Sequence, residues 1–283
     1  MTAKMSNHDM LAQLDAMRAQ EKTVRRRNYF EGGANAITEE CRGAMVSWVK
    51  KTCRALRLSP DTAWIASSFV DRYIASGRGH SGEALASEDH FQLAHVTSFY
   101  LAIKIYEPRA MEVEFVEQIS QYREREVLAM EAELLSALEW RVAVHTPMDV
   151  VRLLLALLSD RLSSPKAEAL LESCQWHVDA SATDMYFACR APSVVGVACL
   201  ASALDASNEW SPAAKQALWS ELSDACHFDL HPPEVTAVRG RLLLYTTPCE
   251  SPTMLADTPM PTRAVGQAKM PIVRSIMGVS DMR

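Results

Sequence analysis

Apolar residues recur every three to four positions along most of this chain, which is the spacing of an amphipathic helix. Residues 38–57, for example, place Met45 and Trp48 on one such stripe. Two segments, 88–106 and 192–206, are apolar nearly all round. That pattern is typical of a helix that other helices enclose. The periodicity therefore predicts an all-α protein.

Proline residues mark the points where the predicted helices begin, since the first helical turn tolerates a missing N–H group. The predicted helices cover residues 9–27, 38–57, 60–76, 88–106, 111–120, 123–139, 147–160, 165–187, 192–206, 212–226 and 232–246. A Gly/Ser-rich loop is expected after residue 76. The second enclosed helix follows the first by about 100 residues, and each stands third in a set of five. This order predicts two similar five-helix units in tandem.

The expected elements divide the chain into four parts. Residues 1–37 hold an N-terminal helix and a linker, 38–143 the first unit, and 144–246 the second unit. Residues 247–283 carry five of the 13 prolines and no sustained apolar period. We therefore predict a disordered C-terminal tail.

Composition narrows the function classes. A hydrophobic share of 48% supports a sizeable core, and only 10 glycines in 283 residues favour helices over tight turns. The net charge of −6 argues against a general nucleic-acid binder, which needs basic side chains at phosphates. We find no apolar run long enough for a membrane span and no secretory signal. The seven cysteines form no C-x-x-C pair, so no metal site or cofactor is expected.

Four charged residues stand out against the helical pattern. Lys104 and Glu131 each lie on an apolar stripe of the first unit. Either residue alone is explained by a side chain that reaches solvent at a helix end. Two opposite charges with the same anomaly favour a pair of charged groups held for another protein. Arg42 and Asp71, on successive helices, suit a buried structural ion pair.

Four segments of the chain resemble the cyclin family in order and spacing. They are RGAMVSWV (42–49), SSFVDRYIA (67–75), FQLAHVTSFYLAIKIYE (91–107) and LAMEAELLSALEWRVAVHTPMDVV (128–151), the last being most like D-type cyclins. The five hallmark positions of the family are all filled, by Arg42, Asp71, Leu93, Lys104 and Glu131. The resemblance implies two tandem five-helix cyclin folds.

By this resemblance the chain is the non-catalytic regulatory subunit of a cyclin-dependent kinase. Lys104 and Glu131 match the pair that grips the αC helix of the kinase. The positions of Leu135, Trp140 and Val142 match apolar residues that pack against the same helix. A partner that binds only the active placement of αC raises the population of that placement.

The resemblance also implies a substrate-docking patch that accepts RxL peptides. The matching residues are Met45, Trp48, Lys51, Phe91 and Gln92. Lys51 stands where the family usually has an acidic residue that meets the arginine of the peptide. Docking is therefore expected to be weak or altered. For Trp48, simple core packing is an equally good interpretation.

Several alternatives remain open from the sequence. The D-like segment favours cell-cycle entry or the G1/S transition, but a transcription-type cyclin fits the same motifs. A tandem cyclin-fold general transcription factor would need a zinc ribbon and a basic surface, and an all-α enzyme would need a carboxylate cluster or a nucleophile with a base. We find none of these. We expect the protein in the nucleus and cytoplasm, where the basic run 22–27 either assists nuclear entry or ends a solvated helix.

Overall fold

The computed structural model describes residues 5–24, 26–31, 36–109, 111–226, 229–230 and 232–245. Within these ranges every regular element is a helix, and thirteen are present. The predicted all-α class is therefore confirmed. The predicted disorder of residues 247–283 lies outside the described residues.

The first unit surrounds helix α5. It consists of α2 (Glu39–Leu56), α3 (Pro60–Ser76), α4 (Glu83–Ala86), α5 (Glu88–Tyr106), α6 (Val113–Ile119) and α7 (Glu124–Ala137). Helix α5 packs against all five of the others. Its side chains are buried on every face over most of its length, which explains why its sequence shows no polar stripe.

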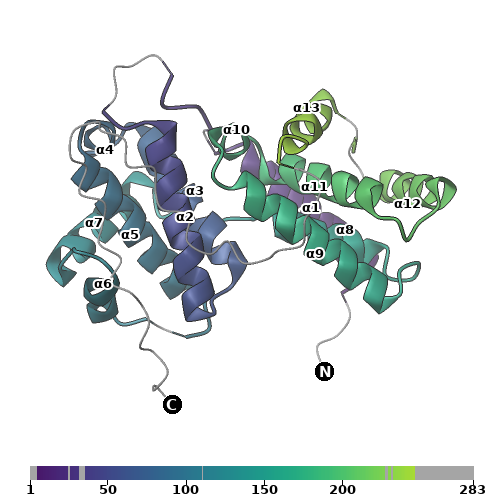
Figure 1. Cartoon of the computed structure of the whole chain (residues 1–283), viewed down its shortest axis with the longest axis horizontal. Helices are drawn as coiled ribbons and strands as arrows, with labels where there is room; N and C mark the ends of the chain where they lie inside the picture. The colour runs from purple at the N-terminus through teal and green to yellow at the C-terminus, as the bar shows by residue number, and fades with distance from the viewer. Residues whose placement is uncertain are drawn as a thin grey trace.

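The second unit repeats this plan around helix α11. Its helices are α8 (Pro147–Leu157), α9 (Ser164–Ser181), α10 (Met185–Ala188), α11 (Pro192–Ala206), α12 (Pro212–Ala225) and α13 (Pro233–Leu242). Helix α11 packs against α8, α9 and α13. The two units lie side by side, with α2 to α7 on the left of Figure 1 and α8 to α13 on the right.

One expected helix and one expected loop of the two units need correction. The predicted helix 165–187 is interrupted after Ser181. At this point the Arg42 guanidinium donates hydrogen bonds to the carbonyl oxygens of Ala182 and Thr183, at 3.1 and 3.2 Å. A side-chain cap from Asp184 then starts the short α10. The predicted loop after α3 likewise contains the short α4. A four-residue helix thus precedes the enclosed helix in each unit.

The N-terminal helix α1 (Asn7–Glu21) packs on the second unit. It ends at Glu21 rather than at residue 27, and its Met10, Leu14 and Met17 are buried in the core of that unit. The Glu21 carboxylate accepts hydrogen bonds from the backbone N–H of Ser193, at 2.7 Å, and from its hydroxyl, so it caps α11. In Figure 1, α1 lies behind α8 and α11. The chain therefore crosses from the second unit back to the first before α2 begins.

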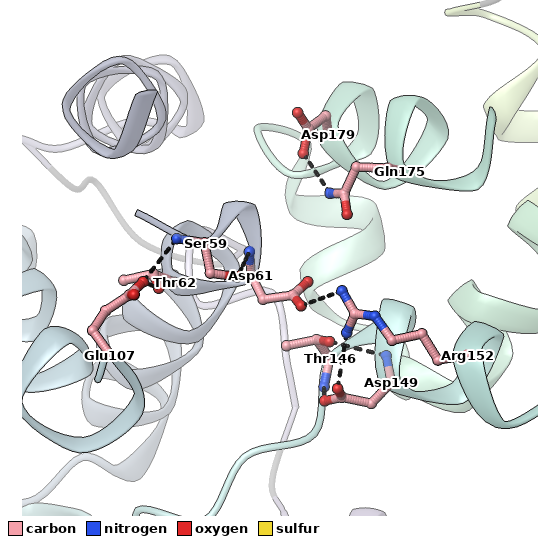
Figure 2. A network of polar contacts seen from close by, with 9 residues as sticks. All are labelled: Ser59, Asp61, Thr62, Glu107, Thr146, Asp149, Arg152, Gln175 and Asp179. Carbon is pink, nitrogen blue, oxygen red and sulfur yellow. Dashed lines mark hydrogen bonds and ion pairs between the residues drawn. The ribbon is translucent and has the colours of Figure 1, made fainter. Parts of the chain in front are cut away.

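Polar contacts join the two units away from their cores. In Figure 2, Asp61 at the start of α3 accepts a hydrogen bond from Arg152 of α8 at 2.6 Å. Arg152 also binds Asp149 at 3.1 Å, and Asp149 forms a capping box with Thr146 at the start of α8. These contacts fix α3 of the first unit beside α8 of the second.

Helix α11 approaches α8 so closely that only glycine fits at position 196. A Cβ atom there would lie 2.6 Å from the carbonyl oxygen of Pro147. We therefore expect Gly196→Ala to lower the free energy of unfolding by about 1–3 kcal/mol, despite the better helix propensity of alanine. Gly240→Ala in α13 is the matched control, since a Cβ there meets nothing within 4 Å. It should raise stability by about 0.5–1 kcal/mol. Urea unfolding measures both, and equal effects would contradict the close approach.

Candidate functional site

Lys104 and Glu131 form an ion pair between the last turn of α5 and the middle of α7. The Lys104 Nζ atom donates to Glu131 Oε1 at 2.7 Å. The two side chains differ in exposure, at 39% for Lys104 and 11% for Glu131. The Lys104 ammonium also lies 5.0 Å from the ring centroid of Tyr100, one turn earlier. The two charges that break the apolar stripes in the sequence therefore meet at one place on the surface.

The electrostatics of this pair keep Lys104 charged. Partial burial by itself lowers the pKa of Lys104, but the hydrogen bond and the charge of Glu131 outweigh it. The resulting pKa of Lys104 lies above its ordinary value. The ammonium group has three donors, and Glu131 uses one of them. The pair can therefore present further donors to the carbonyl oxygens of another protein.

Exposed apolar side chains lie on the same two helices and just after α7. Ile105 is 41% exposed, Leu128 is 40% exposed and Trp140 is 72% exposed. Leu135 and Val142 are partly buried against the core of the first unit. We call these five residues, together with Lys104 and Glu131, the α5–α7 face. Several large apolar side chains left in water on neighbouring elements favour an interaction surface.

The chain leaves α7 through an unusual backbone conformation. Glu139 and Trp140 have φ angles of 53° and 58°, in the left-handed region that bulky residues rarely adopt. Tyr106 holds the following segment, because its hydroxyl donates to Val142 O at 2.8 Å and accepts from Val144 N at 2.7 Å. The strained turn directs Trp140 into solvent, and strain of this kind is commonly kept at functional surfaces.

Sequence reasoning proposed Leu135, Trp140 and Val142 for the α5–α7 face but missed Ile105 and Leu128. It also missed Tyr106, which holds the segment after α7. The spacing of Leu128 and Glu131, three residues apart on one helix, could have pointed to Leu128. The role of Tyr106 could not be found this way, since its partners lie 36 and 38 residues further along the chain.

Arg42 and Asp71 form a bidentate ion pair inside the first unit. Arg42 donates through Nε and Nη2 to the two carboxylate oxygens, at 2.8 and 2.7 Å. Tyr29 also donates to Asp71, at 2.7 Å. Burial lowers the pKa of Arg42, but the Asp71 carboxylate outweighs it and raises that pKa above its ordinary value. With the carbonyls of Ala182 and Thr183, this one side chain joins α2, α3 and the second unit.

The residues proposed for substrate docking lie mostly inside the first unit. Met45, Trp48, Phe91 and Gln92 are 5%, 9%, 1% and 4% exposed. Trp48 packs edge-on against Phe99, with ring centroids 5.9 Å apart. This geometry favours core packing as the role of Trp48.

Two polar side chains of this region differ in exposure. Lys51 is exposed on α2, one turn after Trp48. The Gln92 amide group donates to Glu88 at 3.0 Å, but its carbonyl oxygen has no hydrogen-bond partner among the described residues.

Comparisons with known proteins relate the chain to cyclins. Residues 12–143 match the family described as "Cyclin, N-terminal domain". The chain is 31% identical to G2/mitotic-specific cyclin-1 of Antirrhinum majus over 134 residues, which are 46% of this chain and 27% of that protein. It is 25% identical to G1/S-specific cyclin-D1 of Danio rerio over 212 residues, which are 74% of this chain and 66% of that protein.

A solved structure extends the likeness to most of the chain. A viral cyclin from herpesvirus saimiri superimposes with a TM-score of 0.65 and 16% sequence identity, covering 82% of this chain and 97% of the viral one. At that identity the likeness establishes the fold. The alignments with three plant G2/mitotic cyclins span only 27% to 39% of those proteins.

Residues 12–143 thus match the cyclin N-terminal domain family, and the curated relatives named above are cyclins. Cyclins are non-catalytic regulatory subunits of kinases, which agrees with the predicted class of this chain. Among the residues that the structure describes, no group of three or more His, Cys, Asp or Glu side chains could hold a metal ion. No described helix combines the length and the hydropathy that crossing a membrane requires.

Proposed function

We propose that this chain binds the catalytic subunit of a cyclin-dependent kinase through the α5–α7 face and activates it. The observation that carries the proposal is the Lys104–Glu131 ion pair on α5 and α7, together with the exposed side chains of Ile105 and Leu128 on the same helices and Trp140 just after α7. An exposed aromatic residue beside a partly buried charge pair is typical of a binding hot spot. Of these residues, the cyclin resemblance assigns Lys104, Glu131 and Trp140 to the contact with the kinase αC helix.

Activation then follows from differential binding. A kinase transfers phosphate only when the lysine of its β3 strand and the glutamate of its αC helix are paired. If the α5–α7 face fits only the αC placement in which that pair is formed, binding shifts the population toward the active state. The chain contributes no catalytic group of its own, and the kinase carries out the chemistry.

We propose cell-cycle entry or the G1/S transition as the setting. The alignment with the Danio rerio cyclin-D1 covers 74% of this chain, whereas that with the Antirrhinum majus mitotic cyclin covers 46%. The D-type likeness therefore extends into the second unit. A transcription-type role is the alternative, and the choice of kinase distinguishes the two.

The test is reconstitution with purified proteins. The 283-residue chain is added to a panel of cell-cycle and transcriptional cyclin-dependent kinase subunits, and phosphorylation of a peptide substrate is timed. The phosphorylation rate of at least one cell-cycle kinase should rise at least about tenfold. A smaller rise would mean that binding hardly changes the population of the active kinase conformation. Activation of transcriptional kinases alone would favour the alternative, and no activation of any kinase would contradict the proposal.

We propose altered substrate docking beside Lys51. The exposed ammonium of Lys51 repels the arginine of an RxL peptide, so Lys51→Glu should strengthen binding by about 3- to 10-fold, as expected for one exposed charge pair. Calorimetry with an RxL peptide measures the gain, and Lys51→Gln should give an intermediate value. The gain should vanish when the arginine of the peptide is replaced by alanine. An equal gain with that control peptide would show that Lys51 does not face the arginine.

For localisation we propose the nucleus and the cytoplasm, with residues 22–27 as the candidate entry signal. Lys22 and Arg27 are exposed, whereas the Arg26 guanidinium donates to the Glu21 carbonyl oxygen at 2.8 Å. The run follows α1 directly, because that helix ends at Glu21. Imaging of a tagged chain with and without Lys22→Gln and Arg27→Gln tests this proposal.

A further inference from the structure

A cationic cleft lies where the end of α1, helix α3, the linker at 143–145 and the turn between α10 and α11 meet. Its empty volume, including the solvent at its mouth, is about 760 Å³. Five arginine side chains line it, namely Arg26, Arg27, Arg42, Arg72 and Arg190. Among the described residues, Glu21 and Asp71 are the two carboxylates in its lining. The cleft therefore holds an excess of positive charge in a chain whose net charge is −6.

Both carboxylates are already engaged by other groups. Asp71 is paired with Arg42, and Glu21 accepts two hydrogen bonds from Ser193. That leaves Arg26, Arg27, Arg72 and Arg190, and within the described residues none of these four has a carboxylate oxygen within 4.0 Å. Outside the cleft, seven described arginines do have such partners, namely Arg54, Arg78, Arg141, Arg152, Arg161, Arg239 and Arg241.

Local contacts hold three of these guanidinium groups in place. Arg72 donates through Nη2 to the Arg141 carbonyl oxygen at 2.6 Å, and Arg26 donates to a carbonyl as described above. Arg190 stacks 4.5 Å from the ring centroid of Tyr186. Burial, and then the charge of Arg26, lower the pKa of Arg72 to about 10. The like charges therefore work against one another, and an anion between them would relieve that repulsion.

The last described residue of the chain, Tyr245, lies beside α10, and Met185 and Ala188 of that helix line the cleft. The Tyr245 hydroxyl donates to Asp184 at 2.7 Å, and the same carboxylate accepts from the Tyr186 backbone at 2.8 Å. Tyr186 carries the stacked Arg190 at the rim of the cleft. In the sequence, Ser251 and Thr258 follow Tyr245 by six and thirteen residues, and each precedes a proline. Six extended residues span about 20 Å.

We propose that this cleft binds the phosphate monoester of a phosphorylated serine or threonine. Such a group carries about −1.5 to −2 charges at neutral pH and has three strong acceptor oxygens. Planar guanidinium groups pair with two phosphate oxygens at a time. A dianion offsets most of the excess charge, which a single carboxylate cannot do. The phosphate comes either from this chain, at Ser251 or Thr258, or from another protein. The inference is independent of kinase activation, because it concerns a ligand of the chain alone.

Calorimetry on the full chain tests the site. The probes are O-phosphoserine, a peptide of residues 246–256 phosphorylated at Ser251, its unphosphorylated form, and a scrambled phosphopeptide, all at one ionic strength. We expect the Ser251 phosphopeptide to bind at least tenfold more tightly than its unphosphorylated form. Arg190→Gln and Arg27→Gln should each weaken that binding at least threefold, and together at least tenfold. The matched control Arg125→Gln removes an exposed arginine of α7 that does not line the cleft, and it should leave binding unchanged.

The outcomes separate the sources and decide the proposal. Tighter binding of the Ser251 peptide than of the scrambled one supports this chain as the source, and equal binding supports another protein. Both results uphold the phosphate site. Equal affinity for the phosphorylated and unphosphorylated peptides overturns the proposal. A loss of affinity in Arg125→Gln as large as that in Arg190→Gln or Arg27→Gln also overturns it. Circular dichroism confirms that the variants are folded, and neither Arg190 nor Arg27 takes part in the buried Arg42–Asp71 pair.

Discussion

Replacement of both Lys104 and Glu131 by alanine should abolish kinase binding, with a loss of at least about 100-fold in affinity, or about 3 kcal/mol. The variant removes the ammonium donors and the carboxylate together, so neither charge remains unpaired. The apolar residues Ile105, Leu128 and Trp140 stay in place, and the fold should persist. Surface plasmon resonance with an immobilised kinase subunit measures the affinity, and the reconstituted activity should fall in parallel.

Two further variants make this test specific. Arg161→Ala with Glu221→Ala removes an exposed ion pair of the second unit and leaves the net charge unchanged, as the test variant does. It should bind as the natural chain does. The exchange variant, Lys104→Glu with Glu131→Lys, keeps an internal ion pair. It reverses the positions of the positive and negative charges that the kinase contacts. If the exchanged chain bound the kinase normally, the pair would be structural and the proposed role would be wrong.

Arg42→Ala should cause the largest loss of stability, about 3–5 kcal/mol. The substitution leaves Asp71 with Tyr29 as its remaining described partner, although the Asp71 side chain is only 14% exposed. The Ala182 and Thr183 carbonyls also lose their donor, so the damage reaches the contact between the units. A carboxylate left buried without its counter-charge costs more than a lost surface pair. Urea unfolding followed by circular dichroism measures the change.

Arg54→Ala is the appropriate comparison, because Arg54 also lies on α2 and also binds the second unit. Its pair with Asp179 is 3.5 Å long, and the Arg54 side chain is 70% exposed. Water already screens such a pair, so its loss should cost less than about 1 kcal/mol. Similar losses for Arg42→Ala and Arg54→Ala would mean that burial does not control the contribution of the Arg42 pair.

Much of the fold follows from local patterns in the sequence. The 3/4 spacing of apolar residues and the prolines at helix starts located most of the helices within a few residues. The two segments without a polar face, at 88–106 and 192–206, are α5 and α11, each packed among the helices of its own unit. A helix that is apolar all round is stable only when neighbouring helices cover it. Its sequence alone therefore predicts a central position in its unit.

The candidate site was predictable in part, for the same reason. Lys104 and Glu131 were conspicuous because a charge on an apolar stripe breaks a local rule, and such breaks concentrate at functional positions. The proposed docking residues carried no such signal. In the sequence, Trp48 and Phe91 are compatible with a role in the core and with a role in a docking patch. Their burial in the folded chain favours the core.

The sequence by itself determined the helical class, the repeat of two units and the charged pair, because each depends on the order of side chains along one helix. Only the tertiary structure decided that α1 packs on the second unit and that Tyr106 holds the segment after α7. It also decided that four arginines with no carboxylate partner among the described residues meet in one cleft. These features join residues tens to hundreds of positions apart. Helical periodicity describes neighbours within a few turns, and it carries no information on which distant faces come together.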